Sequence, residues 1–145
     1  MKKFIASMIL ICAVSIASAN PPVSDKVLKQ FTSAFPSVKD AKWFESEDHF
    51  DVYFEKDEVK YQIRYNKAGK IVSTRNYYGG PKLCSFIKTK LAEKFSDKTI
   101  FGVTEITNSD EMYYVVVLED DNCWTNVRCD ATGRMEVLEK LKKAK

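Results

Sequence analysis

The stretch VKYQIRYNKAGKIVSTRNY, Val59 to Tyr77, contains the clearest β-hairpin signal of this 145-residue sequence. From Val59 to Tyr65, apolar and polar side chains alternate with the period of two that is typical of a strand with one buried face. Asn66 suits the first position of a tight turn, and Gly69 can adopt the positive φ that closes a bulged hairpin loop. An extended pattern then resumes, so the stretch predicts strand, turn and strand.

The same pattern returns near the C-terminus as CWTNVRCDATGRMEVLE, residues 123–139. A segment with helical periodicity lies upstream of each hairpin, and four extended segments follow each predicted helix. The glycines and proline of residues 79–81 separate the two series. The sequence therefore predicts an α+β fold, a tandem repeat of one helix plus a four-stranded antiparallel sheet, in units 20–78 and 79–145. We expect the two sheets to be continuous, with both helices on one face. The matching turn residues are Arg64 and Arg128, Asn66 and Asp130, and Gly69 and Gly133.

Residues 1–19 have the layout of a secretory signal peptide. Lys2 and Lys3 precede an apolar run from Phe4 to Ile16, and the small residues that follow it fit the rule for signal cleavage. The apolar run is too short for a membrane span. We therefore expect a periplasmic or secreted protein, residues 20–145, with no membrane attachment after signal cleavage.

The formal net charge is +3, which falls to about +1 when Lys2 and Lys3 leave with the signal peptide. Acidic and basic side chains are interspersed, so the charge pattern does not favour a nucleic-acid partner. The basic run of residues 140–145 is the one local excess, and its simplest interpretation is a solvated C-terminal tail.

Three cysteines remain after the predicted cleavage. Cys123 and Cys129 lie on one predicted strand, about 20 Å apart at the rise of a strand, which is too far for a bond between them. Export permits a disulfide between Cys84 and either Cys123 or Cys129, and three buried free thiols are the alternative. The cysteines have neither paired spacing nor a nearby histidine, so we predict no zinc site.

The sequence lacks the residue combinations typical of enzymes. His49 is the only histidine, and consecutive strand side chains point to opposite faces, so residues 47–51 are interpreted as a solvated strand start and not as a metal site. The acidic run 120–122 lacks the order of a calcium loop and is interpreted as a hairpin turn. Nucleophile-elbow, phosphate-loop and metalloprotease motifs are absent from the sequence. We predict no enzymatic activity, no cofactor and no bound metal.

The strand alternation sorts side chains into a face covered by the helices and an open face. The most apolar set of the first unit is expected under its helix: Phe50, Val52, Phe54, Val59, Tyr61, Ile63 and Tyr65. The open face of that unit is expected to carry Tyr53, Lys60, Gln62, Arg64, Thr74, Asn76 and Tyr78. In the second unit, the open face is expected to carry Tyr114, Val116, Leu118, Trp124, Asn126, Arg128 and Leu138. The residues expected to face the second helix are Cys123, Thr125, Val127 and Cys129.

An open face that mixes tyrosine, tryptophan and arginine with amides has the composition of a recognition surface. We therefore predict a non-enzymatic exported binding protein that recognises a protein or peptide through this face. Association of two copies, or aromatic residues that only stiffen the sheet, are alternatives for this face. The alternative function is a small apolar ligand carrier with a pocket between helices and sheet. The predicted partner-binding residues are Tyr53, Arg64, Tyr78, Tyr114, Trp124, Asn126 and Arg128.

Several short motifs resemble those of a known family. They are Phe31 with Ala34-Phe35-Pro36, Val38, Ala41-Lys42-Trp43, Asp51-Val52-Tyr53-Phe54, and Tyr65 with the turn that follows it. In these residues the chain is similar to the beta-lactamase-inhibitor-like, PepSY-like family of small exported bacterial proteins. The resemblance implies tandem units of one helix plus a four-stranded antiparallel sheet, with a sheet face that presents side chains to a protein partner. The second unit departs from the pattern, because it has Phe95-Ser96 in place of Phe35-Pro36 and has no tryptophan at the position that corresponds to Trp43.

Overall fold

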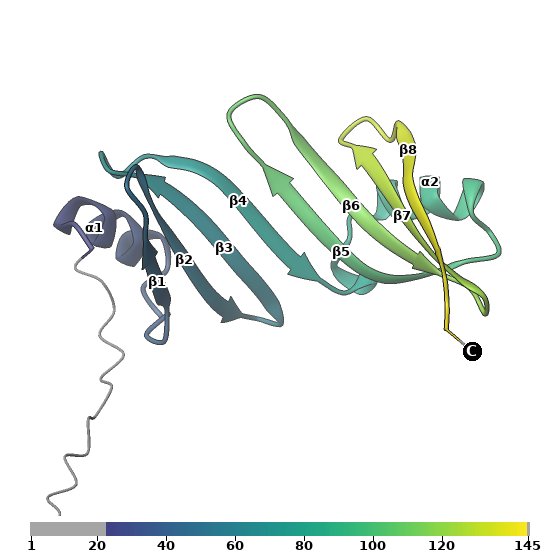
Figure 1. Cartoon of the computed structure of the whole chain (residues 1–145), viewed down its shortest axis with the longest axis horizontal. Coiled ribbons are helices and arrows are strands. Elements are labelled where there is room, and N and C mark those ends of the chain that lie inside the picture. The colour runs from purple at the N-terminus through teal and green to yellow at the C-terminus, as the bar shows by residue number, and fades with distance from the viewer. Residues whose placement is uncertain (1–22, 145) are drawn as a thin grey trace, which may run out of the picture.

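The structure, a computed structural model, describes residues 23–144, and the predicted signal peptide lies outside the described residues. Within that range, two α-helices and eight β-strands follow one another along the chain, with a short 3-10 helix between the halves (Figure 1). Neither α-helix of residues 23–144 has the length and apolar character needed to cross a membrane. The helices are α1 (Asp25–Ala34), η1 (Gly80–Lys82) and α2 (Ser85–Lys94). The strands are β1 (Lys42–Glu45), β2 (His49–Lys56), β3 (Val59–Asn66), β4 (Ile71–Tyr78), β5 (Thr99–Thr107), β6 (Met112–Glu119), β7 (Cys123–Asp130) and β8 (Met135–Lys142).

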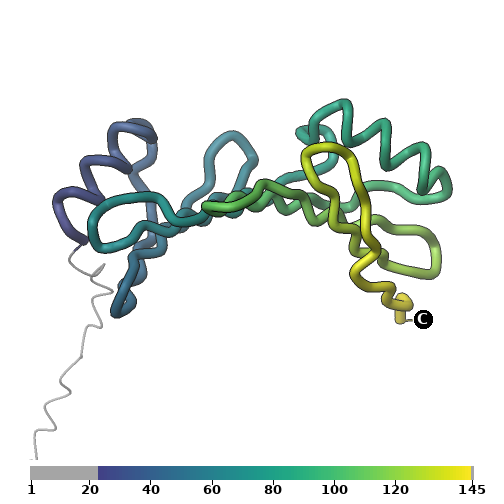
Figure 2. Tube along the Cα trace, turned by 90° about the horizontal axis from the view of Figure 1, so that it is seen from above, coloured from purple at the N-terminus to yellow at the C-terminus, as the bar shows by residue number. Residues whose placement is uncertain are grey.

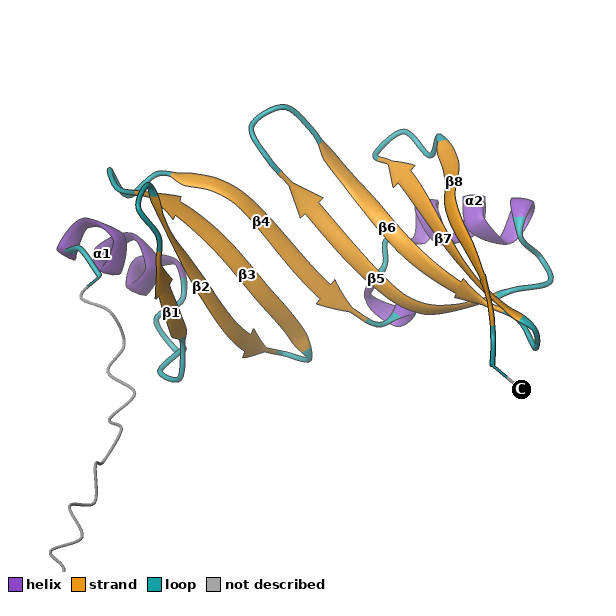
Figure 3. Ribbon diagram, in the orientation of Figure 1, coloured by secondary structure: helices purple, strands orange, loops and turns teal. Residues whose placement is uncertain are grey.

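All eight strands form one open antiparallel sheet, whose spatial order from β1 to β8 is the order along the chain. Strands β4 and β5 join the two halves through paired residues, from Thr74 opposite Thr107 to Tyr78 opposite Val103. The two α-helices lie on the same side of the sheet, one toward each end (Figures 2 and 3). The predicted α+β class and antiparallel sheet are therefore confirmed. The side without described helices is called the open face below.

Helix α1 packs onto the sheet through an aromatic core. The ring of Phe31 meets Trp43 and Phe54 edge-on, with centroids 5.2 and 5.3 Å away. Phe35 ends the helix, and its ring packs 4.7 Å from that of Phe54. Burial of one such ring stabilises the fold by about 1.5–3 kcal/mol. The other buried residues of this first core are Val27, Phe50, Val52, Ile63 and Tyr65.

Helix α2 covers a second core, which is mainly aliphatic where the first is aromatic. Ile87 and Leu91 are the buried residues of the helix, and Leu83 joins them from the segment before it. The two cores are separate clusters, so each helix has its own set of sheet residues beneath it. The sheet residues of the second core are Val103, Tyr114, Val116, Leu118, Val127 and Cys129.

The turns of the two predicted hairpins have matching geometry. Asn66 Oδ1 accepts hydrogen bonds from the backbone N–H groups two and four residues further on, at 3.1 and 2.9 Å. Asp130 Oδ1 accepts the equivalent pair at 2.9 and 3.0 Å. Gly69 and Gly133 have φ values of +86° and +87°, which other residues adopt only with strain. Both predicted turns are confirmed.

Strand β4 shows the opposite face from the one expected. It contains one extra residue, Val72, which forms a bulge against β3. The bulge shifts the alternation by one position, so Thr74 lies opposite the buried Ile63 and on the helix side. The same shift places Asn76 and Tyr78 on the helix side. The predicted open-face positions of these three β4 residues are therefore wrong.

Strand β6 also differs from the prediction. Each buried residue of β6 pairs with a β7 residue that is expected to face the helix. Paired residues on neighbouring strands share a face of the sheet. The register of the β6–β7 turn therefore places these β6 residues under α2, and their predicted open-face position is wrong. They are Tyr114, Val116 and Leu118, which are 7%, 0% and 1% exposed. The residues that β6 turns to the open face are Tyr113, Val115, Val117 and Glu119.

Leu138 is the extra residue of a bulge in the edge strand β8. Its neighbours Val137 and Glu139 pair with Val127 and Asn126 of β7. Leu138 is 49% exposed at the margin of the sheet, so it does not follow the simple alternation from which its open-face position was predicted.

Candidate functional site

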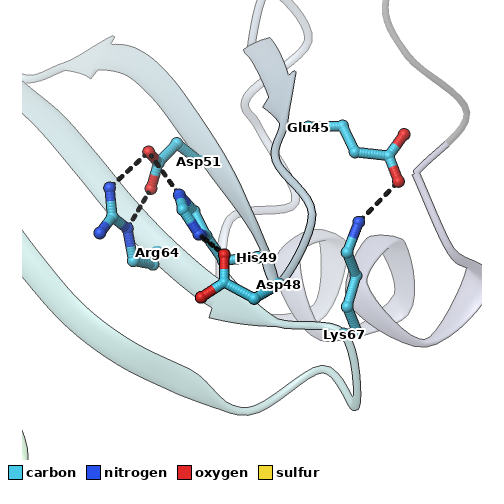
Figure 4. A network of polar contacts seen from close by, with 6 residues as sticks. All are labelled: Glu45, Asp48, His49, Asp51, Arg64 and Lys67. Carbon is cyan, nitrogen blue, oxygen red and sulfur yellow. Dashed lines mark hydrogen bonds and ion pairs between the residues drawn. The ribbon is translucent and has the colours of Figure 1, made fainter.

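An ion pair between neighbouring strands organises the open face of the first half. Asp51 of β2 and Arg64 of β3 lie directly opposite each other. Arg64 Nε and Nη2 each donate a hydrogen bond of 2.8 Å, one to each carboxylate oxygen of Asp51 (Figure 4). A planar guanidinium matches a carboxylate in this bidentate orientation, so the contact fixes both side chains.

Asp51 is charged although it is buried, with only 8% of the residue exposed. The hydrogen bonds from Arg64 lower the pKa of Asp51, while burial acts in the opposite direction. The same hydrogen bonds raise the pKa of Arg64. Both groups are therefore ionised at neutral pH, and Arg64 is held against the sheet as a fixed basic group.

His49 lies between two carboxylates at the start of β2 (Figure 4). Its Nδ1 is 2.5 Å from Asp48 Oδ1, and its Nε2 is 3.5 Å from Asp51 Oδ2. The hydrogen bond with His49 lowers the pKa of Asp48. The expectation that these side chains point apart is wrong. His49 and Asp51 are two residues apart on β2 and therefore share a face, and Asp48 reaches His49 from the turn before the strand. A separate ion pair, Lys67 with Glu45 at 2.6 Å, lies nearby.

Two aromatic residues pack together beside this network. The rings of Phe44 and Tyr53 are 5.4 Å apart and nearly perpendicular, at 89°. Phe44 is 57% exposed and Tyr53 is 37% exposed, so both rings are accessible to a partner. Partial burial raises the pKa of Tyr53, which keeps its hydroxyl neutral and able to donate a hydrogen bond.

In the second half, Arg128 occupies the position that matches Arg64 but has different partners. Its Nη2 lies 2.5 Å from Glu111 Oε2, and its guanidinium lies 4.3 Å from the centroid of the Tyr113 ring. The side chain of Arg128 is 35% exposed, so this cation and the ring below it are both presented on the open face.

Trp124 is the centre of an aromatic group on the same face. The ring of Phe101 packs against it at 4.7 Å and 70°, and Lys143 Nζ lies 4.3 Å from its ring centroid. Lys143 also donates a 3.0 Å hydrogen bond to Glu119. Phe101 is 61% exposed although it is held by the indole. The group therefore combines an accessible apolar ring with an ammonium group that Glu119 holds in place.

Two predicted partner-binding residues are not on the open face. Tyr78 donates a 2.9 Å hydrogen bond to Glu105 on the helix side, and burial strongly raises its pKa. Tyr114 belongs to the second core. Their predicted positions are wrong for the reasons of register given above. The predicted residues that the structure does place on the open face are Tyr53, Arg64, Trp124, Asn126 and Arg128.

The prediction missed four aromatic residues of this face: Phe44, Tyr77, Phe101 and Tyr113. The bulge in β4 turns Tyr77 to this face, where it is 38% exposed. Tyr113 follows from the β6 alternation once Val116 is recognised as buried, so its signal was present in the sequence. Phe101 is the extra residue of a bulge in β5, and Phe44 lies in a strand of only four residues. Neither of these two positions has an alternation long enough to identify it.

The thiols of Cys84, Cys123 and Cys129 are all free within residues 23–144. Cys84 is exposed just before α2, whereas Cys129 is fully buried in the second core, where burial raises its pKa. Cys84 lies close enough to Cys129 and Tyr114 to add to the raised pKa of both groups, for which burial is the main cause. A disulfide of Cys84 with Cys123 or Cys129 stays a prediction. Among the described residues, no group of side chains is arranged to hold a metal ion.

The helix side carries a pocket of about 390 Å³ between α2 and the start of β5. This volume lies within the range of small-molecule sites. A wider depression of about 690 Å³ lies along the outer side of α1, but its walls are exposed and largely polar. The residues that line the 390 Å³ pocket are Gly80, Pro81, Lys88, Leu91, Ala92, Phe95, Lys98, Thr99, Ile100 and Leu118.

Comparison with solved structures finds a similar fold in several Bacteroides proteins. A DUF2874 family protein from Bacteroides ovatus has a TM-score of 0.63 and 15% identity, over 86% of this chain and 89% of that chain. A BLIP-like protein from Bacteroides fragilis has a TM-score of 0.62 and 13% identity, with the same coverage. A candidate periplasmic protein from Bacteroides eggerthii has a TM-score of 0.62 and 13% identity, over 83% and 88% of the two chains.

No protein-family model matches this chain, and no curated protein matches its sequence. At 13–15% identity the structural likeness concerns the fold alone. The open antiparallel sheet with two helices is thus a fold that this chain shares with a DUF2874 family protein and a BLIP-like protein.

Proposed function

We propose that this protein is a non-enzymatic, exported binding protein that recognises a protein or peptide through the open face of its sheet. The observation that carries the proposal is the set of accessible aromatic rings on that face, each packed on another ring or beside a cation. Rings held in this way lose little conformational freedom on binding. The set comprises Phe44, Tyr53, Phe101, Tyr113 and Trp124.

The size of the face suits a protein partner. Seven strands about 26 Å long and the half-length β1, spaced about 4.8 Å apart, give a face of roughly 900 Å². Each partner in a protein interface of standard size contributes about 800 Å². Arg64 and Arg128 stand among the rings, and arginine, tyrosine and tryptophan are the residues most often found at the energetic centres of interfaces. A partner surface with carboxylates and apolar side chains would complement this arrangement.

We infer a periplasmic or secreted location from the signal-peptide pattern of residues 1–19. The fold shared with a candidate periplasmic protein supports this location. The shared fold with a BLIP-like protein, together with the motifs around Phe35 and Trp43, supports distant kinship with the BLIP-like, PepSY-like group. Inhibition of an enzyme by the open face is the specific form of binding that this kinship suggests.

We also infer that the two halves arose by tandem duplication, as units 20–78 and 79–145. The matching turns at Asn66 and Asp130 support this inference. So do the helix ends, where the backbone N–H of Phe35 and that of Phe95 each donate a 2.8 Å hydrogen bond to the carbonyl four residues earlier. Such paired local geometry at fixed spacing is typical of a duplicated unit.

Partner capture with matched variants tests the open-face proposal. Immobilised residues 20–145 are exposed to periplasmic extract, in parallel with a variant that carries Tyr53→Ala, Trp124→Ala and Arg128→Ala. The control variant carries Lys26→Ala, Lys29→Ala and Gln30→Ala, which change the exposed outer side of α1. We expect one protein to bind the unchanged chain and the control but not the open-face variant.

Circular dichroism of the three proteins shows whether the substitutions leave the fold intact. A partner that binds all three proteins equally would contradict the assignment of the open face. Sedimentation of the unchanged chain at several concentrations tests the other occupant of this face, a second copy. Self-association that the open-face variant abolishes, without a captured partner, would replace hetero-recognition by homo-association.

A further inference from the structure

The two helix-covered cores are filled differently. In the first core, the rings of Phe54 and Tyr61 are stacked, with centroids 4.7 Å apart and planes 7° from parallel. The ring of Phe35 packs against both, at 4.7 and 5.8 Å. These three rings fill the space between the C-terminal end of α1 and the sheet.

The second core has smaller side chains at the matching positions. Phe54 lies directly opposite Tyr61, and Leu118 lies directly opposite Thr125 in the same place of the second half. Phe95 ends α2 with the same backbone hydrogen bond that ends α1. The second core therefore keeps the phenylalanine at the helix end but has leucine and threonine where the first core has two stacked rings.

The 390 Å³ pocket lies at this position, between the end of α2 and the sheet. Leu91, Phe95 and Leu118 line it, and Leu91 and Leu118 are only 2% and 1% exposed, so the pocket reaches the margin of the core. Among the described aromatic contacts, Phe95 has Lys94 near its ring but no second ring. The pocket thus corresponds to space that aromatic rings occupy in the first half.

One of the two lysines in the pocket wall is available to an anion. Lys98 is paired with Asp120 and with Asp97, so its charge is already neutralised. Lys88 Nζ donates a 3.2 Å hydrogen bond to the carbonyl of Pro81, and it forms no ion pair with the carboxylates of residues 23–144. An ammonium group has three donors, so two remain for a ligand.

A buried hydroxyl on the strand next to the pocket wall also lacks a partner. Thr125 is 2% exposed, and its Oγ1 has no hydrogen-bond partner within the described part of the chain. A buried hydroxyl without a hydrogen-bond partner destabilises the folded protein by about 1–3 kcal/mol, so such hydroxyls are rare. Thr125 stands directly opposite Leu118, which lines the pocket. The chain does not itself complete the packing and hydrogen bonding of this region.

We propose that the pocket binds a small aromatic carboxylate. The ring of the ligand packs against Phe95 and Leu118 and restores the aromatic contacts present in the first core. Its carboxylate pairs with the ammonium of Lys88 at the rim. The site is on the helix side of the sheet, so it does not depend on the proposed function of the open face.

Titration with 3-phenylpropionate, followed by the amide NMR shifts of residues 20–145, tests the proposal. For a ligand of this size we expect a dissociation constant on the order of 1 mM or tighter. The shifts should be concentrated at the residues that line the pocket. 3-Phenylpropionamide lacks the charge and should bind roughly tenfold more weakly. 3-Cyclohexylpropionate lacks the ring and should bind several-fold more weakly.

Matched variants separate the two parts of the site. Lys88→Gln should weaken binding of the carboxylate roughly tenfold and leave binding of the amide unchanged. Lys90→Gln is the control, because Lys90 lies on the same helix, is paired with Glu93 and does not line the pocket. Ala92→Trp places a large side chain at the exposed rim and should abolish binding of both probes.

Thermal melting of each variant shows that the fold is retained. Absence of pocket shifts at about 10 mM 3-phenylpropionate, ten times the expected constant, would overturn the proposal. Unchanged binding by Ala92→Trp would also overturn it, as would an equal effect of Lys88→Gln on the carboxylate and the amide. Loss of binding by Ala92→Trp together with a carboxylate-specific effect of Lys88→Gln supports it.

Discussion

Arg64 and Arg128 occupy matching positions in their hairpins but should contribute unequally to stability. Arg64 neutralises Asp51, which is 8% exposed, whereas Glu111 beside Arg128 has a half-exposed side chain. Arg64→Ala leaves a buried carboxylate without its partner and should lower the free energy of unfolding by about 1–3 kcal/mol. Arg128→Ala should lower it by less than about 1 kcal/mol. Urea denaturation of both variants measures these changes, and equal losses would contradict the distinction.

The Asp51–Arg64 pair should make stability depend on pH in the acid range. The pKa of Asp51 is lowered in the folded protein, so the pair stabilises the fold fully above the unfolded value of about 3.9. This contribution is lost as the pH falls through the folded pKa. The difference in unfolding free energy between the unchanged chain and Asp51→Asn should therefore be larger at about pH 6 than at about pH 2.

Denaturant unfolding at the two pH values measures this difference. Asp110→Asn is the control, because Asp110 lies in the exposed β5–β6 loop and its side chain forms no ion pair with the described residues. A difference for Asp51→Asn that stays the same from neutral to acid pH would show that the ion pair does not set the acid stability.

Among the structural elements, the turn after β7 depends on Gly133. Its φ is +87°, and a Cβ added there would lie 3.2 Å from the ring of Phe86. Gly133→Ala should therefore destabilise the protein by about 1–2 kcal/mol. Gly102→Ala in β5 is the matched control, because a Cβ there meets nothing within 4 Å, and its effect should stay within about 0.5 kcal/mol. Thermal melting compares them, and similar melting temperatures would show that the turn accepts a side chain.

The elements that could be predicted from the sequence depend on local chemistry. The Asn66 turn needs only a side-chain acceptor and a glycine three residues later, and α1 follows from the spacing of Val27 and Phe31. The face of β4 could not be predicted in this way. The bulge at Val72 shifts the alternation of β4 by one residue, so it changes which side chains of β4 face the first core. The sequence around Val72 has no distinct pattern that identifies the bulge.

The candidate site was predictable to the extent that it follows one uninterrupted strand. Arg64, Trp124 and Arg128 lie on β3 and β7, whose alternation agrees with the structure. Phe101 was missed because it is a bulge residue. The ion pair of Asp51 with Arg64 was also missed, because a cross-strand contact requires the register of two strands and not the pattern of one.

For the whole molecule, the two halves should unfold together. The cores are separate, but β4 and β5 are paired over residues 74–78, and separation of the halves would expose both strand edges. The chain has two tryptophans, Trp43 in the first core and Trp124 in the second half. Trp43→Phe and Trp124→Phe each leave a reporter for one half. In each variant, the urea midpoint from fluorescence should equal the midpoint from circular dichroism.

Two separate midpoints in either variant would show that the halves are independent folding units. The comparison is made within each variant, so a general loss of stability from Trp43→Phe does not affect it. A loss of stability is expected for Trp43→Phe, because Trp43 is only 7% exposed and a smaller ring removes packing contacts in the first core.

The spatial order of the strands, identical to their order in the sequence, has a consequence for biogenesis. No described strand has to wait for a partner from a distant part of the polypeptide, so assembly can proceed from the N-terminus as the chain emerges. Helix α1 and strands β1 to β4 can close the first core before the second half arrives. The edge of β4 is then unpaired until β5 follows along the chain and forms hydrogen bonds with it.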